Sequence, residues 1–248
     1  MVFGSVESSI LGKVARGEKL HVSLIDPDPS KLSMKELEKR AKQLEGWGTD
    51  AFFVGGSTNF TKEDVDKTVK KIKSVCKVPV ILYPGNPKGV SEHADAILFM
   101  SLLNSKDPYW ISHAQAKSAL LIRKLGLEPI PMAYLIVEPG MKAGEVGKAE
   151  LIKTAEEAAG YSAAAEMFGF RMVYLEAGSG ATRPVPVEMV KAARKELSIP
   201  LIVGGGLRTA ESVRERLRAG ADIIVTGTAI EKEFDRLEGI VKEIKNFR

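Results

Sequence analysis

Cysteine, aromatic residues and long apolar runs are all scarce in this chain of 248 residues. Its single cysteine, Cys76, excludes a disulfide within the chain, which suits a protein of a reducing compartment. No apolar run approaches the roughly 20 residues that a helix needs to cross a bilayer, and no signal-peptide pattern opens the sequence. We therefore expect a cytoplasmic protein without a transmembrane helix.

A strong excess of either charge is also absent. Lysine and arginine number 36 against 32 acidic residues, and the basic residues are spread along segments such as 67–77 and 208–218 rather than gathered in a tail. Nucleic-acid binding therefore gains little support. The slight positive balance fits a phosphorylated small substrate, but solvated outer faces of helices explain it more simply.

Short runs rich in Val, Ile, Leu and Phe alternate along the chain with longer segments whose apolar residues recur at helical spacing. This alternation is typical of parallel strands joined by helices. The expected strands are 20–25, 51–54, 80–83, 96–100, 130–136, 172–175, 201–203 and 222–226. Eight strands close a TIM-type (β/α)8 barrel, which forms one domain at about 250 residues, so we predict an α/β fold with a single domain over residues 1–248.

The segments between the expected strands carry helix signals of two kinds. A hydroxyl residue three positions before an acid, the pattern of a capped helix start, occurs at Ser33 with Glu36, Thr61 with Asp64 and Thr228 with Glu231. Apolar stripes that should pack on the barrel wall are Val65, Val69, Ile72 and Cys76, and Ile230, Phe234, Leu237, Val241 and Ile244. Cys76 is thus predicted to be a buried small apolar residue rather than a reactive thiol.

Small-residue turns follow the last three expected strands, at residues 177–180, 204–206 and 227–228. Active sites of such barrels lie beyond the carboxyl ends of the strands. Glycine there lets backbone amides approach an anion, and a helix start adds a partial positive charge. The turns after strands seven and eight therefore predict a phosphate site, although one glycine pair alone would be explained by a tight turn.

Asp26 and Ser57 stand just beyond the first and second expected strands. Their oxygens suit magnesium, which usually takes only one or two protein groups while substrate phosphates and water complete its octahedron. The two residues therefore mark a candidate magnesium site. Residues that merely cap turns would give the same pattern, and these two positions alone do not decide between the readings.

Glu176 follows the sixth expected strand, in a barrel mouth that is partly apolar. Such surroundings raise the pKa of a carboxyl group toward the range in which it can take a proton from a hydroxyl group, so Glu176 is a candidate general base. Tyr174, two residues earlier and on the same face of the strand, is placed to hydrogen-bond a substrate or to orient that carboxylate. A structural salt bridge is the alternative role for Glu176.

Motifs at the strand ends extend from about residue 20 to residue 228: Leu24 to Asp28, Val54 to Ser57, Gly169 to Arg171, Tyr174 to Gly180, Ile202 to Gly206 and Thr226 to Thr228. Together they resemble the geranylgeranylglyceryl phosphate synthase family. The resemblance implies a magnesium-dependent prenyltransferase on a TIM-type barrel. Such an enzyme joins the sn-3 hydroxyl of sn-glycerol 1-phosphate to C1 of geranylgeranyl diphosphate and releases diphosphate, which makes the first ether bond of archaeal membrane lipids.

The resemblance also implies a role for each matching residue. Mg²⁺ would bind at Asp26 and Ser57, and Glu176, beside Tyr174, would take the proton of the glycerol hydroxyl. Glycerol phosphate would bind at Tyr174, Leu175, Glu176, Ala177, Gly178, Ser179, Gly180, Gly205, Gly206, Gly227 and Thr228. The family forms dimers and larger rings, so a homo-oligomer is expected, and release of a lipid-like product implies peripheral contact with a membrane.

The prenyl chain requires an apolar groove that leads away from the metal. Side chains around the third and fourth expected strands are candidates for its lining, although many must simply be core: Tyr83, Phe99, Met100, Leu102, Leu103 and Trp110. The stretch 138–147 follows the fifth strand, contains three glycines and is the longest irregular one. It is predicted to be either a mobile lid or a passive surface loop.

Two other functions stay open on the residues alone. A sugar-phosphate isomerase or lyase shares the glycine turns after strands seven and eight. It would want an acid and a base, commonly at strands one and five, and strand five offers no evident partner before Glu138. A non-catalytic barrel scaffold has no use for Asp26 and Glu176 in a barrel mouth, where each acid costs desolvation.

Overall fold

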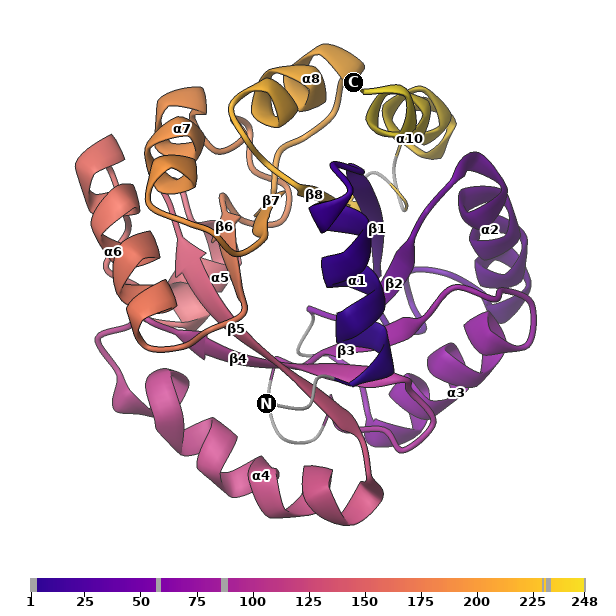
Figure 1. The fold of residues 1–248 in the computed structure, drawn as a ribbon. Helices are drawn as coiled ribbons and strands as arrows, with labels where there is room; N and C mark the ends of the chain where they lie inside the picture. Colours follow the sequence, from indigo (N-terminus) through magenta and orange to yellow (C-terminus); the bar gives the residue numbers. More distant parts are fainter. Residues whose placement is uncertain (1–3, 57–58, 86–88, 229, 231–232, 248) are drawn as a thin grey trace.

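Eight parallel strands form a closed barrel in chain order (Figure 1). The structure, a computed structural model, describes residues 4–56, 59–85, 89–228, 230 and 233–247. The strands are β1 (Leu20–Ile25), β2 (Ala51–Gly55), β3 (Val80–Tyr83), β4 (Ala96–Leu102), β5 (Glu128–Ile136), β6 (Met172–Glu176), β7 (Leu201–Gly204) and β8 (Ile223–Thr226). The TIM-type barrel predicted from the alternating pattern is confirmed, and no strand end differs from its expected position by more than two residues.

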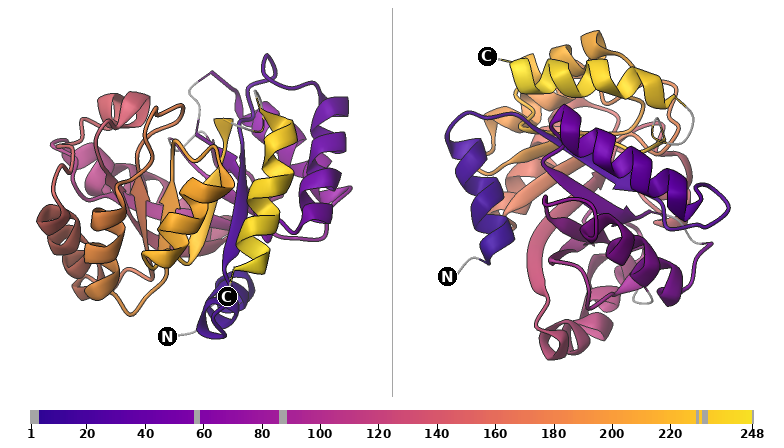
Figure 2. Two further views of the ribbon diagram at one scale, coloured as in Figure 1. Left: turned by 90° about the horizontal axis from the view of Figure 1, so that it is seen from above. Right: turned by 90° about the vertical axis from the view of Figure 1, so that its right-hand side faces the viewer.

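Helices surround the barrel, and one of them, α1, lies across its amino-terminal end (Figures 1 and 2). The carboxylate of Glu128 holds α1 there, because it accepts the N–H groups of Val6 (3.0 Å) and Glu7 (2.7 Å) at the first turn of the helix. The helices are α1 (Ser5–Ala15), α2 (Met34–Trp47), α3 (Lys62–Lys73), α4 (Ala114–Leu125), α5 (Met141–Val146), α6 (Ala155–Met167), α7 (Val187–Lys195), α8 (Ala210–Arg218) and α10 (Leu237–Asn246), with a π-helical turn η2 (Tyr109–His113) and a 3₁₀ turn η3 (Phe234–Arg236). In the described part of the chain, no helix is both long and apolar enough to span a membrane.

The predicted helix starts are found where the structure describes them. Thr61 and Asp64 form a complete capping box at the start of α3. Ser33 caps α2 by accepting the N–H of Glu36 at 3.2 Å, whereas the side chain of Glu36 pairs with Arg40 instead of reaching back. The third predicted pair includes Glu231, which lies outside the described residues.

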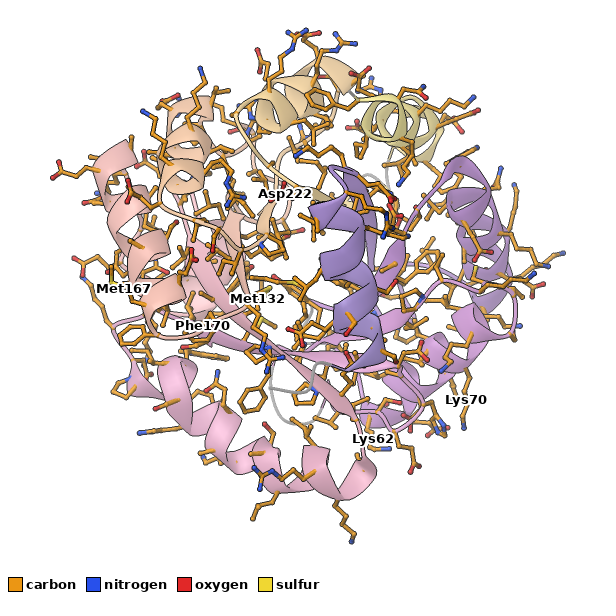
Figure 3. All side chains as sticks on the ribbon, in the orientation of Figure 1. Lys62, Lys70, Met132, Met167, Phe170 and Asp222 are labelled. Atoms are coloured by element: carbon orange, nitrogen blue, oxygen red, sulfur yellow. The ribbon has the colours of Figure 1, made fainter. Side chains whose placement is uncertain are left out.

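The core has two layers, separated by the wall of the barrel. Residues at alternate strand positions fill the barrel interior, while those between them pack against the surrounding helices. In Figure 3 the side chain of Met132 lies within the barrel, whereas Lys62 and Lys70 of α3 point outward. Both predicted apolar stripes are in the outer layer except for Val241, which is buried but not part of that cluster, and Cys76 is a buried member of the layer.

The stretch 138–147 is not irregular throughout, because its second half forms the short helix α5. Its first half is hydrogen-bonded to its neighbours: the N–H of Glu138 donates to the Ile152 carbonyl and that of Gly140 to the Ala177 carbonyl, both at 3.0 Å. The expectation of an irregular stretch was therefore wrong for residues 141–146. A mobile lid stays a prediction.

Candidate active site

The carboxyl ends of the strands open into a cavity of about 630 Å³, at the end opposite to α1. Parallel strands place the residues that follow them at one edge, so segments far apart in the chain meet there. Nine of the predicted site residues line this cavity: Asp26, Tyr174, Glu176, Ser179, Gly180, Gly205, Gly206, Gly227 and Thr228.

Glu176 ends β6 with its side chain pointing into the barrel mouth, and it is only 5% exposed. Its Oε1 accepts the N–H of Gly178 at 2.6 Å, and its carboxylate also accepts the hydroxyl of Tyr174. Burial raises the pKa of Glu176, although the hydrogen bonds from Tyr174 and Gly178 partly oppose that rise. Within the described ranges no basic side chain pairs with Glu176, so none of these residues forms the structural salt bridge that was the alternative.

Three tyrosines form a layer in the barrel interior next to Glu176. The rings of Tyr134 and Tyr174 lie edge to face, with centroids 5.3 Å apart, and Tyr83 lies 5.9 Å from Tyr134. Burial, and then the charge of Glu176, hold the pKa of Tyr174 well above its ordinary value. All three hydroxyls therefore stay protonated at neutral pH, and Tyr174 donates to Glu176 while Tyr134 donates to Tyr83.

Gly205 lets the turn after β7 approach Glu176 closely. Its φ of +82° belongs to the left-handed region that favours glycine. A Cβ atom at this position would overlap the Glu176 Oε1 and the backbone of Gly178. The turns after β6 and β7 are therefore packed with no space for a side chain between them.

The turns after β6 and β8 are joined across the cavity by their hydroxyl groups. Ser179 and Thr228 share a hydrogen bond of 2.9 Å between their Oγ atoms. The Arg208 guanidinium donates to the Gly180 carbonyl at 3.3 Å from the loop after β7 and lines the same cavity. Glycine backbone, two hydroxyls and one guanidinium are groups that bind a phosphate.

An apolar arm of the cavity runs between β4 and α4. The outward-facing side chains of Ile97 and Phe99 form one wall, and Ser118 and Ile122 of α4 form the other. Of the six side chains predicted for a prenyl groove, five line the cavity: Tyr83, Phe99, Met100, Leu102 and Trp110. Leu103 instead packs against the outer core.

Several predicted site residues do not reach the cavity. The side chains of Leu175 and Ala177 point outward and are fully buried in the outer core, because alternate residues of a strand face opposite sides. Gly178 lies behind the cavity wall, where it donates to Glu176. Ser57 lies outside the described residues.

The residues at the cavity that were missed from the sequence include Lys31, Tyr134 and Arg208. Tyr134 could have been found from strand register, since it pairs with Tyr174 on the neighbouring strand and faces the same side. Lys31 and Arg208 lie in loops, where no periodicity marks a direction.

Comparison with known proteins identifies the family. The PcrB family model matches residues 13–247. A geranylgeranylglyceryl phosphate synthase of Pyrococcus abyssi is 50% identical over 246 residues, which cover 98% of this chain and 97% of that protein. The chain belongs to the PcrB family. A second synthase, from Thermococcus gammatolerans, is 51% identical over 231 residues, which cover 92% of this chain and 90% of its own.

Solved structures agree with the PcrB assignment. The (S)-3-O-geranylgeranylglyceryl phosphate synthase of Thermoplasma acidophilum, solved in complex with its substrate sn-glycerol-1-phosphate, is 42% identical, with a TM-score of 0.92 and 99% of each chain covered. A 2-epimerase of N-acetylmannosamine-6-phosphate from Clostridium perfringens, at 17% identity and a TM-score of 0.58, shares the fold alone. The family and the enzyme class predicted from the motifs are confirmed.

Proposed function

We propose that this PcrB family enzyme joins the sn-3 hydroxyl of sn-glycerol 1-phosphate to C1 of geranylgeranyl diphosphate, with magnesium, as the first step of archaeal-type ether lipid synthesis. The observation that carries the proposal is the position of Glu176. This desolvated carboxylate, without a cationic partner in the described chain, lies between a phosphate-binding group of turns and an apolar arm. The names of the relatives at about 50% identity support the same substrates.

Glu176 would act as the general base for the acceptor hydroxyl. As the new bond forms between the glycerol oxygen and C1, the hydroxyl proton passes to the carboxylate of Glu176, and the bond from C1 to diphosphate breaks with its electron pair on the diphosphate. A raised pKa makes the Glu176 carboxylate a stronger base, which favours this proton transfer. The Tyr174 hydroxyl and the Gly178 N–H orient the carboxylate.

The phosphate of the acceptor would lie between the turns after β6, β7 and β8. Ser179, Thr228 and Arg208 offer two hydroxyls and a cation beside the glycines of these turns. Held there, the glycerol would present its far hydroxyl toward Glu176, so binding and reaction would share one cavity. The apolar arm between β4 and α4 would take the prenyl chain.

Magnesium fits the residues present at the end of β1. The side chain of Asp26 is 11% exposed and opens onto the cavity. No group of three or more acidic, histidine or cysteine side chains suited to a metal occurs among the residues that the structure describes. One carboxylate suffices for magnesium when diphosphate oxygens and water complete its shell. Asp26 would hold the ion, with Ser57 as the second predicted ligand, and magnesium would neutralise the leaving diphosphate.

We also propose peripheral contact with a membrane through the outer face of α4, and a homo-oligomeric state as in the family. Leu120 and Leu121 are exposed on α4, at 78% and 44%, beside the exposed basic residues Lys117, Arg123 and Lys124. The helix contains no acidic residue. Basic and apolar side chains together favour an anionic bilayer surface, and the opposite face of α4 lines the apolar arm.

Product formation tests the proposed function directly. Purified protein should convert sn-glycerol 1-phosphate and a prenyl diphosphate to an ether product only when magnesium is present. A series of donors from ten to thirty-five carbons gives the preferred chain length, and sn-glycerol 3-phosphate is the stereochemical control. Folded protein that makes no ether from any of these donors would contradict the proposal.

A further inference from the structure

Asp28 forms most of the hydrogen bonds that hold the loop after β1, and Asp26 adds one of its own. The Asp28 Oδ1 accepts the N–H (2.9 Å) and the hydroxyl (2.7 Å) of Ser30, and its Oδ2 accepts the side-chain amide of Asn59 at 3.0 Å. The N–H of Lys31 donates to the Asp28 carbonyl at 3.1 Å. These four bonds hold the turn from Asp28 to Lys31 in addition to the ion pair between the Lys31 side chain and Asp26.

Both carboxylate oxygens of Asp26 are in use. Oδ1 accepts the N–H of Asp28 at 3.0 Å, and Oδ2 forms an ion pair with the Lys31 Nζ at 2.5 Å. Lys31 and Asp26 both line the cavity, together with Gly227 and Thr228 of the turn after β8. The Lys31 side chain is 36% exposed, against 11% for Asp26. The ammonium group therefore occupies Oδ2 at the cavity, an oxygen that a magnesium ion bound to Asp26 would also use.

A magnesium ion bound at Asp26 would compete with the Lys31 ammonium for the same oxygen. Two cations at one carboxylate repel each other, and the repulsion is strongest inside a cavity that excludes water. The substrate brings a compensating group, because diphosphate carries several negative charges and enters with the metal. A lysine side chain ends in a point charge on a flexible stem of four carbons, so its ammonium can exchange one oxyanion for another nearby while the backbone turn stays in place.

We propose that Lys31 is a diphosphate-binding residue: it pairs with Asp26 in the free enzyme and transfers to the diphosphate group when magnesium takes the carboxylate. The inference rests on the proposed prenyl diphosphate substrate. When the bond from C1 to diphosphate breaks, the electron pair stays on the diphosphate oxygen, and the Lys31 charge offsets it. The hydrogen bonds of Asp28 would keep the backbone turn in place while the Lys31 ammonium changes partner.

The exchange predicts effects of opposite sign in a Lys31→Met variant. Magnesium alone, measured by isothermal titration calorimetry without diphosphate, should bind more tightly than to the wild type, because the carboxylate of Asp26 is relieved of its competitor. Inorganic diphosphate at saturating magnesium should bind at least about tenfold more weakly, because one charge-assisted hydrogen bond is lost. Lys31→Arg should restore most of the diphosphate affinity. Lys35→Met, an exposed lysine four residues further on that does not line the cavity, is the matched control.

A structural role for Lys31 would weaken both affinities together and lower the melting temperature, which would overturn the proposal. Unchanged diphosphate affinity in Lys31→Met would overturn it as well. Failure of the proposed function would give a different result. Wild-type protein would then not bind diphosphate in the presence of magnesium, and it would not form an ether product. Wild-type protein that forms the ether, while Lys31→Met binds diphosphate normally, would remove only the role of Lys31.

Discussion

Replacing Glu176 by Gln should separate catalysis from binding in this enzyme. The carboxylate accepts one hydrogen bond from the Gly178 N–H and one from the Tyr174 hydroxyl. A glutamine oxygen can keep the bond to Gly178, and its amide can donate to the Tyr174 oxygen. The packing of the three turns should therefore survive the change, while the group that accepts the proton is lost.

The size of the effect follows from the role of the base. A positioned general base contributes roughly 10²- to 10⁴-fold to a rate, so kcat should fall by that factor, which is about 2.7 to 5.4 kcal/mol at 1.36 kcal/mol per tenfold. The affinity for sn-glycerol 1-phosphate should change by no more than about threefold, since its phosphate is expected at Ser179, Thr228 and Arg208 instead.

The pH dependence supplies an independent readout. Because burial raises the pKa of Glu176, the wild-type kcat/KM should fall, as pH decreases, already above the ordinary glutamate range, and Glu176→Gln should lack this limb. A carboxyl group with a raised folded-state pKa stabilises the protein below its unfolded-state pKa, and this stability is lost as pH rises through the folded-state pKa. Glu176→Gln should therefore melt at or above the wild-type temperature at neutral pH, and the difference should narrow in acid.

Steady-state kinetics, a binding titration with sn-glycerol 1-phosphate and melting curves from pH 4 to 8 test this reasoning together. Equal losses of turnover and acceptor affinity would refute the assignment of Glu176 as the base. So would an acid limb that persists unchanged in the variant, because another group would then take the proton.

Three further changes test other parts of the structure. Gly205→Ala should lower kcat at least about hundredfold, because the new Cβ overlaps the carboxylate of the proposed base, whereas Gly160→Ala, in open space, should stay active by the same assay. Burial lowers the pKa of His21 to about 3, so the free energy of unfolding should fall by on the order of 5 kcal/mol as pH drops from 6.5 toward 3. In urea titrations, His21→Gln should show a smaller change of the unfolding free energy with pH. Leu120→Gln should weaken co-sedimentation of the protein with anionic vesicles severalfold. Met167→Gln, which changes an 86% exposed side chain of α6, is the control and should bind vesicles like the wild type. If Leu120→Gln disrupts the oligomer and leaves vesicle binding unchanged, the α4 face is a contact between subunits.

The strands and their inward residues could be predicted because both follow from periodicity. Alternation by two residues places Tyr174 and Glu176 on one face of β6, and the structure has both in the barrel interior. The same rule shows why two residues of this motif were wrongly predicted to line the substrate site. Leu175 and Ala177 belong to the motif in sequence, but their side chains face the helices.

The loop conformations could not be predicted, because they depend on hydrogen bonds to residues far away in the chain. The position of Lys31 follows from Asp28, which is itself bonded to Asn59, 31 residues further on. Helix α5 was missed because it is only six residues long and includes Gly144, so it offers no apolar stripe. The groove was predicted more successfully, since Phe99 and Met100 lie on a strand whose two faces border the cavity.

The polarity of the barrel interior changes along β6, and this gradient explains how a carboxylate can be buried there. Met172 lies near the end closed by α1 among apolar side chains, Tyr174 follows in the tyrosine layer, and Glu176 lies at the mouth. An acid in place of Met172 would lie among the apolar side chains of the inner core, and its burial would cost desolvation of the charge. At the mouth, a tyrosine hydroxyl and a backbone N–H offset part of that cost. The remaining desolvation is what raises the pKa of Glu176 and suits it to accept a proton.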